Sequence, residues 1–319
     1  MRKKLSLKNN RKKFNEGYDE FINYCKVRNL RPATIKHYED IIKYTWNSYF
    51  DEDRYIDEIS LKTIEGFIIY CKGKGQKEVT INTNIRGIRA VLYYFMKMDY
   101  LDEFKISEIK ENKEIIETYT KEEIEVLLKK PNIKKCPFYE YRNWVICNFL
   151  LATGCRASTL VNIKVTDVDL DNGLIHYSHT KNRKQQAVPI SGTLQLILVE
   201  YIAYIDGNEY LFPNAYGEQL KAKSLSHTLM NYNRRRGIEK TGCHRWRHTF
   251  AKMMILNGAD VFRLQKMLGH SDMSIVKNYV NMFATDLQEN FDRFNPLETV
   301  QQKKKEYIRI KNNSWLETI

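Results

Sequence analysis

The strongest constraint on the fold is a hydrophobic repeat of helical period that fills the first hundred residues. It recurs in four stretches, at residues 14–25, 35–45, 59–71 and 79–98. Apolar residues three and four positions apart lie on one face of a helix. Arg31-Pro32 separates the first two stretches, and Ser60 fits the N-cap of the third. The sequence therefore predicts a four-helix domain over residues 14–102, with no strand.

The repeat changes period further along the chain. Asp171-Asn172-Gly173 stands between two short stretches of alternating apolar residues, 168–170 and 174–180. Asn-Gly in that setting predicts a β-hairpin. A second turn at 181–184 leads into a third strand at 186–190, and the pattern is mainly helical from Ser191 onward. The expected fold class is mostly α with a small antiparallel β-sheet.

A helix-start signal marks a second domain. Thr120-Lys121-Glu122-Glu123 precedes an apolar run, as in a capping box. Residues 103–118, before it, lack a long apolar face and are interpreted as a linker. The expected organisation is a basic arm at 1–13, a helical domain at 14–102, the linker at 103–118, a second domain at 119–295 and a tail at 296–319.

Composition narrows the function. The chain has 52 Lys and Arg against 39 Asp and Glu, a net charge of +13, which favours a nucleic-acid partner. No apolar run is long enough for a membrane span, and no secretory signal is found, so a cytoplasmic location is expected. Six scattered cysteines fit a reduced protein and not a disulfide scaffold. Phosphate-binding glycine motifs of nucleotide enzymes are absent from the sequence.

Residues suited to phosphodiester chemistry gather in the second domain. In chain order they are Arg156, Lys181, His244, Arg247, His270 and Tyr279, called here the catalytic set. An arginine fork matches two phosphate oxygens, and a lysine on a hairpin turn suits proton delivery in a DNA groove. Each residue alone is ordinary, because most arginines are solvated and the chain has 21 tyrosines. Together they predict a site that clamps a phosphate and attacks it with a phenol.

A metal site at the same place is an alternative interpretation. His244 and His248 have the i, i+4 spacing of zinc ligands. However, no glutamate follows His244, and the two arginines between these histidines would repel a cation. No metal and no other cofactor is therefore expected.

At this point the sequence resembles the tyrosine recombinase, or phage integrase, family. The matching segments are residues 152–156, 180–189, 244–250 and 268–279, with the helices around 34–38 and 80–94. The resemblance covers most of the chain. It implies a helical, SAM-like core-binding domain followed by a mixed α/β catalytic domain.

The resemblance also implies roles. Tyr279 would form a 3′-phosphotyrosyl intermediate, with the two arginines balancing phosphate charge and the two histidines assisting. Lys181 would protonate the leaving 5′-oxygen, with Lys184 as a rival. Many family members carry an acid where this chain has Thr159, so Asp167 or Asp169 is a candidate substitute.

Further arginines are candidates for contact with DNA, although a solvated charged face explains them as well. They are Arg86 and Arg89 on the fourth predicted helix and the run Arg234, Arg235 and Arg236.

The C-terminal segment suggests contacts between copies of the chain. The pattern at residues 280–294 predicts a helix, after which the tail would pack on a neighbouring protomer. The implied partners are double-stranded DNA recombination sites, three further copies in a tetramer, and an accessory or directionality factor, with no membrane.

The biological role is left between alternatives. The basic tail and Thr159 favour the integrase or transposase of a mobile element. A Xer-type recombinase that resolves chromosome or plasmid dimers is the alternative. A type IB topoisomerase fits less well because the N-terminal helices resemble those of a recombinase. A catalytically silent DNA-binding module would lack the nucleophile or the arginines, and neither is missing here.

Overall fold

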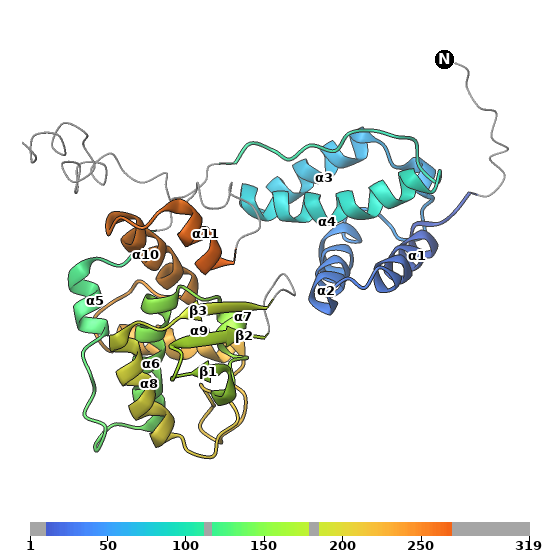
Figure 1. Ribbon diagram of the computed structural model, residues 1–319. Coiled ribbons are helices and arrows are strands. Elements are labelled where there is room, and N and C mark those ends of the chain that lie inside the picture. Colours follow the sequence, from blue (N-terminus) through green and yellow to red (C-terminus); the bar gives the residue numbers. More distant parts are fainter. Residues whose placement is uncertain (1–10, 112–116, 179–184, 270–319) are drawn as a thin grey trace, which may run out of the picture. The chain divides into compact units, whose positions relative to one another are not determined.

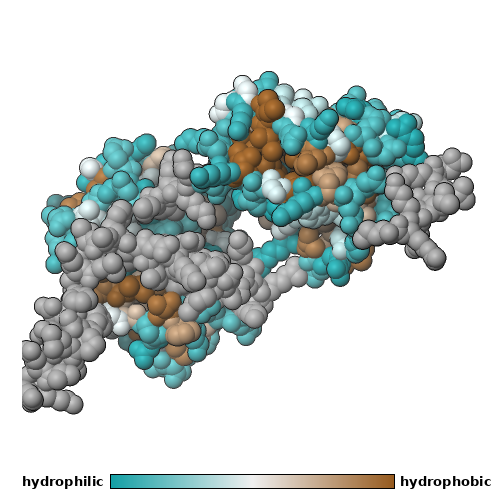
Figure 2. Space-filling model, turned by 90° about the horizontal axis from the view of Figure 1, so that it is seen from above, coloured by the Kyte–Doolittle hydropathy of each residue, from teal (hydrophilic) through white to brown (hydrophobic). Residues whose placement is uncertain are grey.

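The computed structural model describes residues 11–111, 117–178 and 185–269. The chain forms two compact units that divide between Glu114 and Ile115 (Figure 1). Hydrophilic side chains cover much of the described surface on the face drawn in Figure 2, and apolar ones gather in a few patches. Among the described helices, none combines the length and the apolar character that a membrane span requires.

The first unit is built from the four predicted helices. They are α1 (Phe14–Val27), α2 (Pro32–Ile41), α3 (Leu61–Gly73) and α4 (Glu78–Lys97). Pro32 occupies the first turn of α2, where its missing N–H costs nothing, and Ser60 is the N-cap of α3. A π-helical turn (Ile42–Trp46) continues α2, and a 3-10 turn (Ile56–Glu58) precedes α3. The apolar faces enclose a core whose largest fully buried side chains include Trp46, Phe67 and Phe95.

The segment interpreted as a linker packs on this unit instead. Ile106 is buried, and Ile109 packs against the helical core. The Asn82 side chain in α4 donates to the Ile109 carbonyl at 2.9 Å and accepts from the Ile109 N–H at 2.9 Å. Two isoleucines three residues apart are too short a pattern to reveal an apolar face. The sequence therefore missed that residues 104–111 lie along α4.

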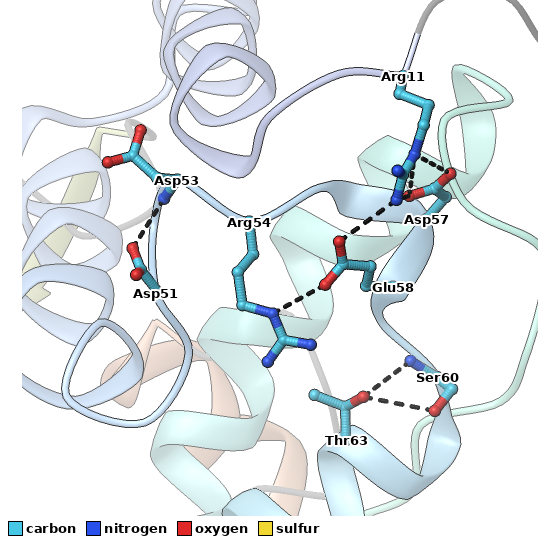
Figure 3. A network of polar contacts seen from close by, with 8 residues as sticks. All are labelled: Arg11, Asp51, Asp53, Arg54, Asp57, Glu58, Ser60 and Thr63. Carbon is cyan, nitrogen blue, oxygen red and sulfur yellow. Dashed lines mark hydrogen bonds and ion pairs between the residues drawn. The ribbon is translucent and has the colours of Figure 1, made fainter.

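The described end of the basic arm is also docked. Arg11 pairs with Asp57 at 3.0 Å and with Glu58 at 3.3 Å (Figure 3). Lys12 pairs with Glu20 and Lys13 with Asp53 in the same way. Acidic groups of the helical unit thus neutralise residues 11–13 in this structure. Residues 1–10 of the arm lie outside the described residues.

The second unit surrounds a buried central helix. Its helices are α5 (Lys121–Leu127), α6 (Phe138–Thr153), α7 (Ala157–Leu160), α8 (Gly192–Tyr204), α9 (Ala222–Arg234), α10 (Cys243–Leu256) and α11 (Val261–Leu268). Helix α6 packs against α8, α9 and α10, and is apolar on most of its surface. The predicted capping box is present, because the Thr120 hydroxyl accepts from the Glu123 N–H and the Glu123 carboxylate from the Thr120 N–H.

A three-stranded antiparallel sheet accompanies these helices. It consists of β1 (Val168–Asp169), β2 (Leu174–Tyr177) and β3 (Gln186–Pro189), in that order. Ile175 pairs with Val168 on one side and Val188 on the other, and its side chain enters the core. Gly173 ends the first hairpin turn at φ +64°, a conformation that glycine adopts without strain. The mostly α fold with a small antiparallel sheet is confirmed.

Helix α7 is shorter than the sequence indicates. The pattern at 156–164 predicts that a helix restarts after Gly154 and spans these residues, but α7 ends at Leu160 and a 3-10 turn (Val165–Asp167) follows. The Asp167 carboxylate accepts from the Lys164 N–H at 2.9 Å, which stabilises that turn. Acidic side chains near a backbone N–H often favour turns over helix in this way.

Candidate active site

Arg247 is the structural centre of the described site. Its side chain belongs to α10 and is buried, with the residue only 2% exposed. One terminal nitrogen, Nη1, donates to the Gly154 carbonyl at 2.8 Å, and the other, Nη2, donates to the Leu268 carbonyl at 2.8 Å. These carbonyls end α6 and α11, where helix dipoles favour a positive charge. One guanidinium therefore joins three of the sequence segments that carry the catalytic set.

Gly154 allows the end of α6 to pack closely against α10. A glycine just after the apolar stretch at 144–152 predicts a helix end, and Gly154 terminates α6 in the left-handed conformation at φ +59°. A Cβ on Gly154 would lie 2.2 Å from Cδ1 of Phe250 in α10, so no larger residue fits there without movement. Arg156 is the N-cap residue of α7, and its charge acts on His244 in the first turn of α10.

The surroundings of His244 lower the pKa of its ring and so favour the neutral form. Partial desolvation is the first cause that lowers its pKa, followed by the positive charges of Arg247 and Arg156. Its ring meets the His248 ring edge to face, with centroids 4.6 Å apart. An exposed imidazole with a lowered pKa beside two arginines is suited to accept a proton from a group that binds there.

His248 is a site residue whose role the sequence did not foresee. The sequence pattern indicates His248 only as a candidate metal ligand. Burial, then the charges of His244, Arg247 and Arg245, lower the pKa of His248 to about 4. A neutral His248 adds no further positive charge beside His244. The i, i+4 spacing on a helix was the signal, but the prediction from this spacing concerned only metal ligands, whereas in the structure the spacing brings the two rings into contact.

Three members of the catalytic set are thus brought together, namely Arg156, His244 and Arg247. The remaining members, Lys181, His270 and Tyr279, lie outside the described residues, as does Lys184. The described residues of the second unit run from 117 to 178 and from 185 to 269. Lys181 and Lys184 fall in the gap between these ranges, and His270 and Tyr279 follow the second range. The roles of all six residues stay predictions.

The proposed substitutes for the missing acid have other partners. Asp167 accepts from the Lys164 N–H and from the Ser178 hydroxyl at 2.9 Å. Asp169 accepts from the Asn172 N–H at 2.9 Å and from its side-chain amide at 2.7 Å. Both carboxylates stabilise turns next to β1. Thr159 is buried in α7.

Glutamates bridge four of the five arginines predicted to contact DNA. In the first unit Glu108 pairs with Arg86 at 2.8 Å and with Arg89 at 3.0 Å. In the second unit Glu140 pairs with two consecutive arginines, Arg235 at 2.7 Å and Arg236 at 2.6 Å. The fifth, Arg234, has a longer ion pair of 3.7 Å, with the exposed Glu239.

Comparison with known families identifies the class of protein. The model of the phage integrase family matches residues 117–285, and that of the phage integrase SAM-like domain matches residues 13–113. The chain belongs to the phage integrase family, the tyrosine recombinases, which are enzymes that cleave and rejoin DNA. The family expected from the sequence is confirmed, with a SAM-like domain preceding the catalytic domain.

Individual relatives are similar over nearly their whole length. Tyrosine recombinase XerD of Listeria innocua is 27% identical, covering 88% of this chain and 99% of the relative. Tyrosine recombinase XerD of Staphylococcus haemolyticus is 28% identical, covering 87% and 98%.

Solved structures share the fold. An integrase of transposon Tn1549 in complex with transposon right end DNA has a TM-score of 0.72 at 19% identity, covering 89% of this chain and 99% of that one. A lambda integrase dimer bound to a COC′ core site has a TM-score of 0.68 at 15% identity, covering 83% and 97%.

Proposed function

We propose that this chain is a site-specific recombinase that acts on double-stranded DNA through a 3′-phosphotyrosyl intermediate formed by Tyr279. The observation that carries the proposal is the convergence at Arg247. Its guanidinium joins the ends of α6 and α11, while its charge and that of Arg156 lower the pKa of His244. Two cations and a histidine with a lowered pKa, which can act as a base, are groups suited to a phosphodiester substrate.

The proposed reaction needs no external energy. The Tyr279 hydroxyl attacks the scissile phosphorus, and its proton passes to His244, which is needed because a phenol has a pKa of about 10. The bond from phosphorus to the 5′-oxygen breaks, and Lys181 protonates that oxygen. Arg156 and Arg247 balance charge on the non-bridging oxygens. A 5′-hydroxyl of a partner strand then attacks the phosphotyrosine and reverses the step.

Between the biological roles, a Xer-type recombinase is better supported than a mobile-element integrase. The XerD relatives match this chain over almost their entire length. The likeness to the transposon integrase, at 19% identity, concerns the fold. A lambda integrase with this fold is described as a tetramer bound to a Holliday junction, which supports assembly of four copies on two DNA sites. An accessory or directionality factor remains a prediction.

A covalent trapping experiment tests the reaction and the role together. The purified chain is incubated in a metal chelator with nicked genomic fragments, so that a cleaved strand diffuses away and leaves protein on the 3′-end. We expect denaturation-resistant adducts, and sequencing of the attached DNA should return one recurrent chromosomal or plasmid locus. Recovery of mobile-element ends would instead support the integrase role. DNA binding without any adduct would contradict the proposed activity.

Neutralising Glu108 is expected to strengthen DNA binding. Glu108→Gln frees Arg86 and Arg89 from their shared ion pair, so that both charges become available to phosphates. Affinity for DNA should rise by roughly 3-fold to 10-fold at low salt. The plot of log affinity against log salt concentration should become steeper by about one to two units, which corresponds to one or two more released counterions. Titrations at several salt concentrations measure both.

Glu209→Gln is the matched control for Glu108→Gln. It removes the same charge from an exposed carboxylate that forms an ion pair of 2.8 Å with Lys164, a residue that is not among the predicted DNA contacts. The same gain in both variants would show that only net charge matters. It would remove the case for Arg86 and Arg89 as specific phosphate contacts.

A further inference from the structure

The last turn of α11 is held by donors from two other elements. Gln186, the first residue of β3, donates from Nε2 to the Lys266 carbonyl at 2.9 Å and to the Met267 carbonyl at 2.7 Å. Arg247 donates to the next carbonyl, that of Leu268. The final carbonyls of a helix have no partner within the helix. Here three successive ones accept from a strand and from a neighbouring helix, and the Lys266 carbonyl also accepts from the Gly269 N–H at 3.2 Å.

The fit between Gln186 and this helix end is close. Gly269 terminates α11 in the left-handed conformation, and a Cβ there would lie 2.5 Å from Oε1 of Gln186. The orientation of the amide follows from its chemistry, because only its NH₂ group can serve two carbonyl acceptors. Gln186 is itself fixed by the sheet, where it pairs with Tyr177 of β2.

We propose that Gln186 is a positioning residue for phosphate cleavage. It fixes the last turn of α11, so that the Leu268 carbonyl holds the Arg247 guanidinium at the site of the scissile phosphate. Gln186 acts through Arg247 and need not touch DNA. This inference rests on the proposed function of Arg247, and it assigns a role in catalysis to a residue that the sequence showed only as the start of a strand.

Gln186→Glu is the most informative variant. Glutamate has nearly the same shape but no donor at this position, so it repels the two carbonyls. Gln186→Arg restores donors in a planar fork, and its positive charge is favourable at a helix C-terminus. Gln219→Glu is the matched control, because Gln219 likewise donates to two oxygens, of Val161 at 3.2 Å and of Asn162 at 2.8 Å.

Single-turnover cleavage is measured on two nicked substrates, one with the ordinary scissile phosphate and one with a methylphosphonate. The methylphosphonate has no negative charge for an arginine to balance. Gln186→Glu should slow cleavage of the phosphate substrate about tenfold or more, with unchanged DNA affinity. Its cleavage rate on the methylphosphonate substrate should fall much less. Gln186→Arg should recover most of the rate, and Gln219→Glu should keep it.

Several outcomes would overturn the inference. These are an unchanged rate in Gln186→Glu, an equal loss on both substrates, or no recovery in Gln186→Arg. Failure of the wild-type chain to cleave either substrate would instead contradict the proposed function. Hydrogen exchange of the α11 amides still decides the structural claim in that case, because exchange should quicken in Gln186→Glu and not in Gln219→Glu.

Discussion

Replacing Tyr279 with phenylalanine is expected to abolish the covalent protein–DNA adduct and to leave DNA affinity unchanged. The substitution removes a single oxygen, which is the proposed nucleophile, and a phenyl ring offers no other atom that can attack phosphorus. The arginines proposed to bind phosphate are untouched. The measurement is adduct formation on a nicked substrate in chelator, followed by gel electrophoresis under denaturing conditions, with affinity determined separately.

Tyr216→Phe provides the control for Tyr279→Phe. Tyr216 is 89% exposed in the loop between α8 and α9, and its hydroxyl should be dispensable. The Tyr216→Phe variant should form the covalent adduct at the wild-type rate. An adduct that persists in Tyr279→Phe would show that another tyrosine is the nucleophile, and peptide mapping of the adduct would then identify it.

The fold was predictable where local patterns determine structure. Four apolar repeats gave the four helices of the first unit, the reciprocal bonds of Thr120 and Glu123 matched the capping signal, and Gly154 ended α6. Each of these features depends on residues that are near one another in the chain. The helical period and the cap chemistry are therefore visible without knowledge of tertiary contacts.

Contacts between distant residues were not predictable in this way. Arg86 and Arg89 were interpreted as a DNA-facing or solvated pair, but their partner Glu108 lies in a segment that offered no clear pattern. The bonds of Gln186 reach carbonyls eighty or more residues away. Sequence patterns show that a charge or an amide is present, while only the fold determines which group it meets.

The candidate site depends both on local sequence patterns and on contacts between distant residues. The order of arginine, histidine and tyrosine motifs identified Arg156, His244 and Arg247, which the structure brings together. The reason that Arg247 is buried was not visible, since its acceptors are backbone carbonyls of Gly154 and Leu268. Carbonyl acceptors exist at every residue and leave no mark in the sequence. The ring contact of His248 with His244 fits their i, i+4 spacing but was not predicted, and the lowered pKa of His248 depends on the burial found in the structure.

Arg247→Lys is expected to impair both cleavage and folding although it preserves the charge. A lysine ammonium is a compact donor and cannot span the two carbonyls that Nη1 and Nη2 reach from opposite ends of one planar group. One buried carbonyl is left without its donor, which should lower the free energy of unfolding by about 1–3 kcal/mol. The loss of one aligned donor to the phosphate should reduce the cleavage rate by roughly 10²-fold to 10³-fold.

Single-turnover cleavage and urea unfolding separate the two effects of Arg247→Lys. Cleavage is measured at a temperature where the variant remains folded, so that lost stability does not lower the rate. Arg263→Lys is the control, because the Arg263 side chain is 81% exposed on α11 and should tolerate the change in both assays. A wild-type rate in a destabilised Arg247→Lys variant would make Arg247 a purely structural tie between α6 and α11. Arg156 would then be the remaining described guanidinium proposed to balance the charge of the phosphate.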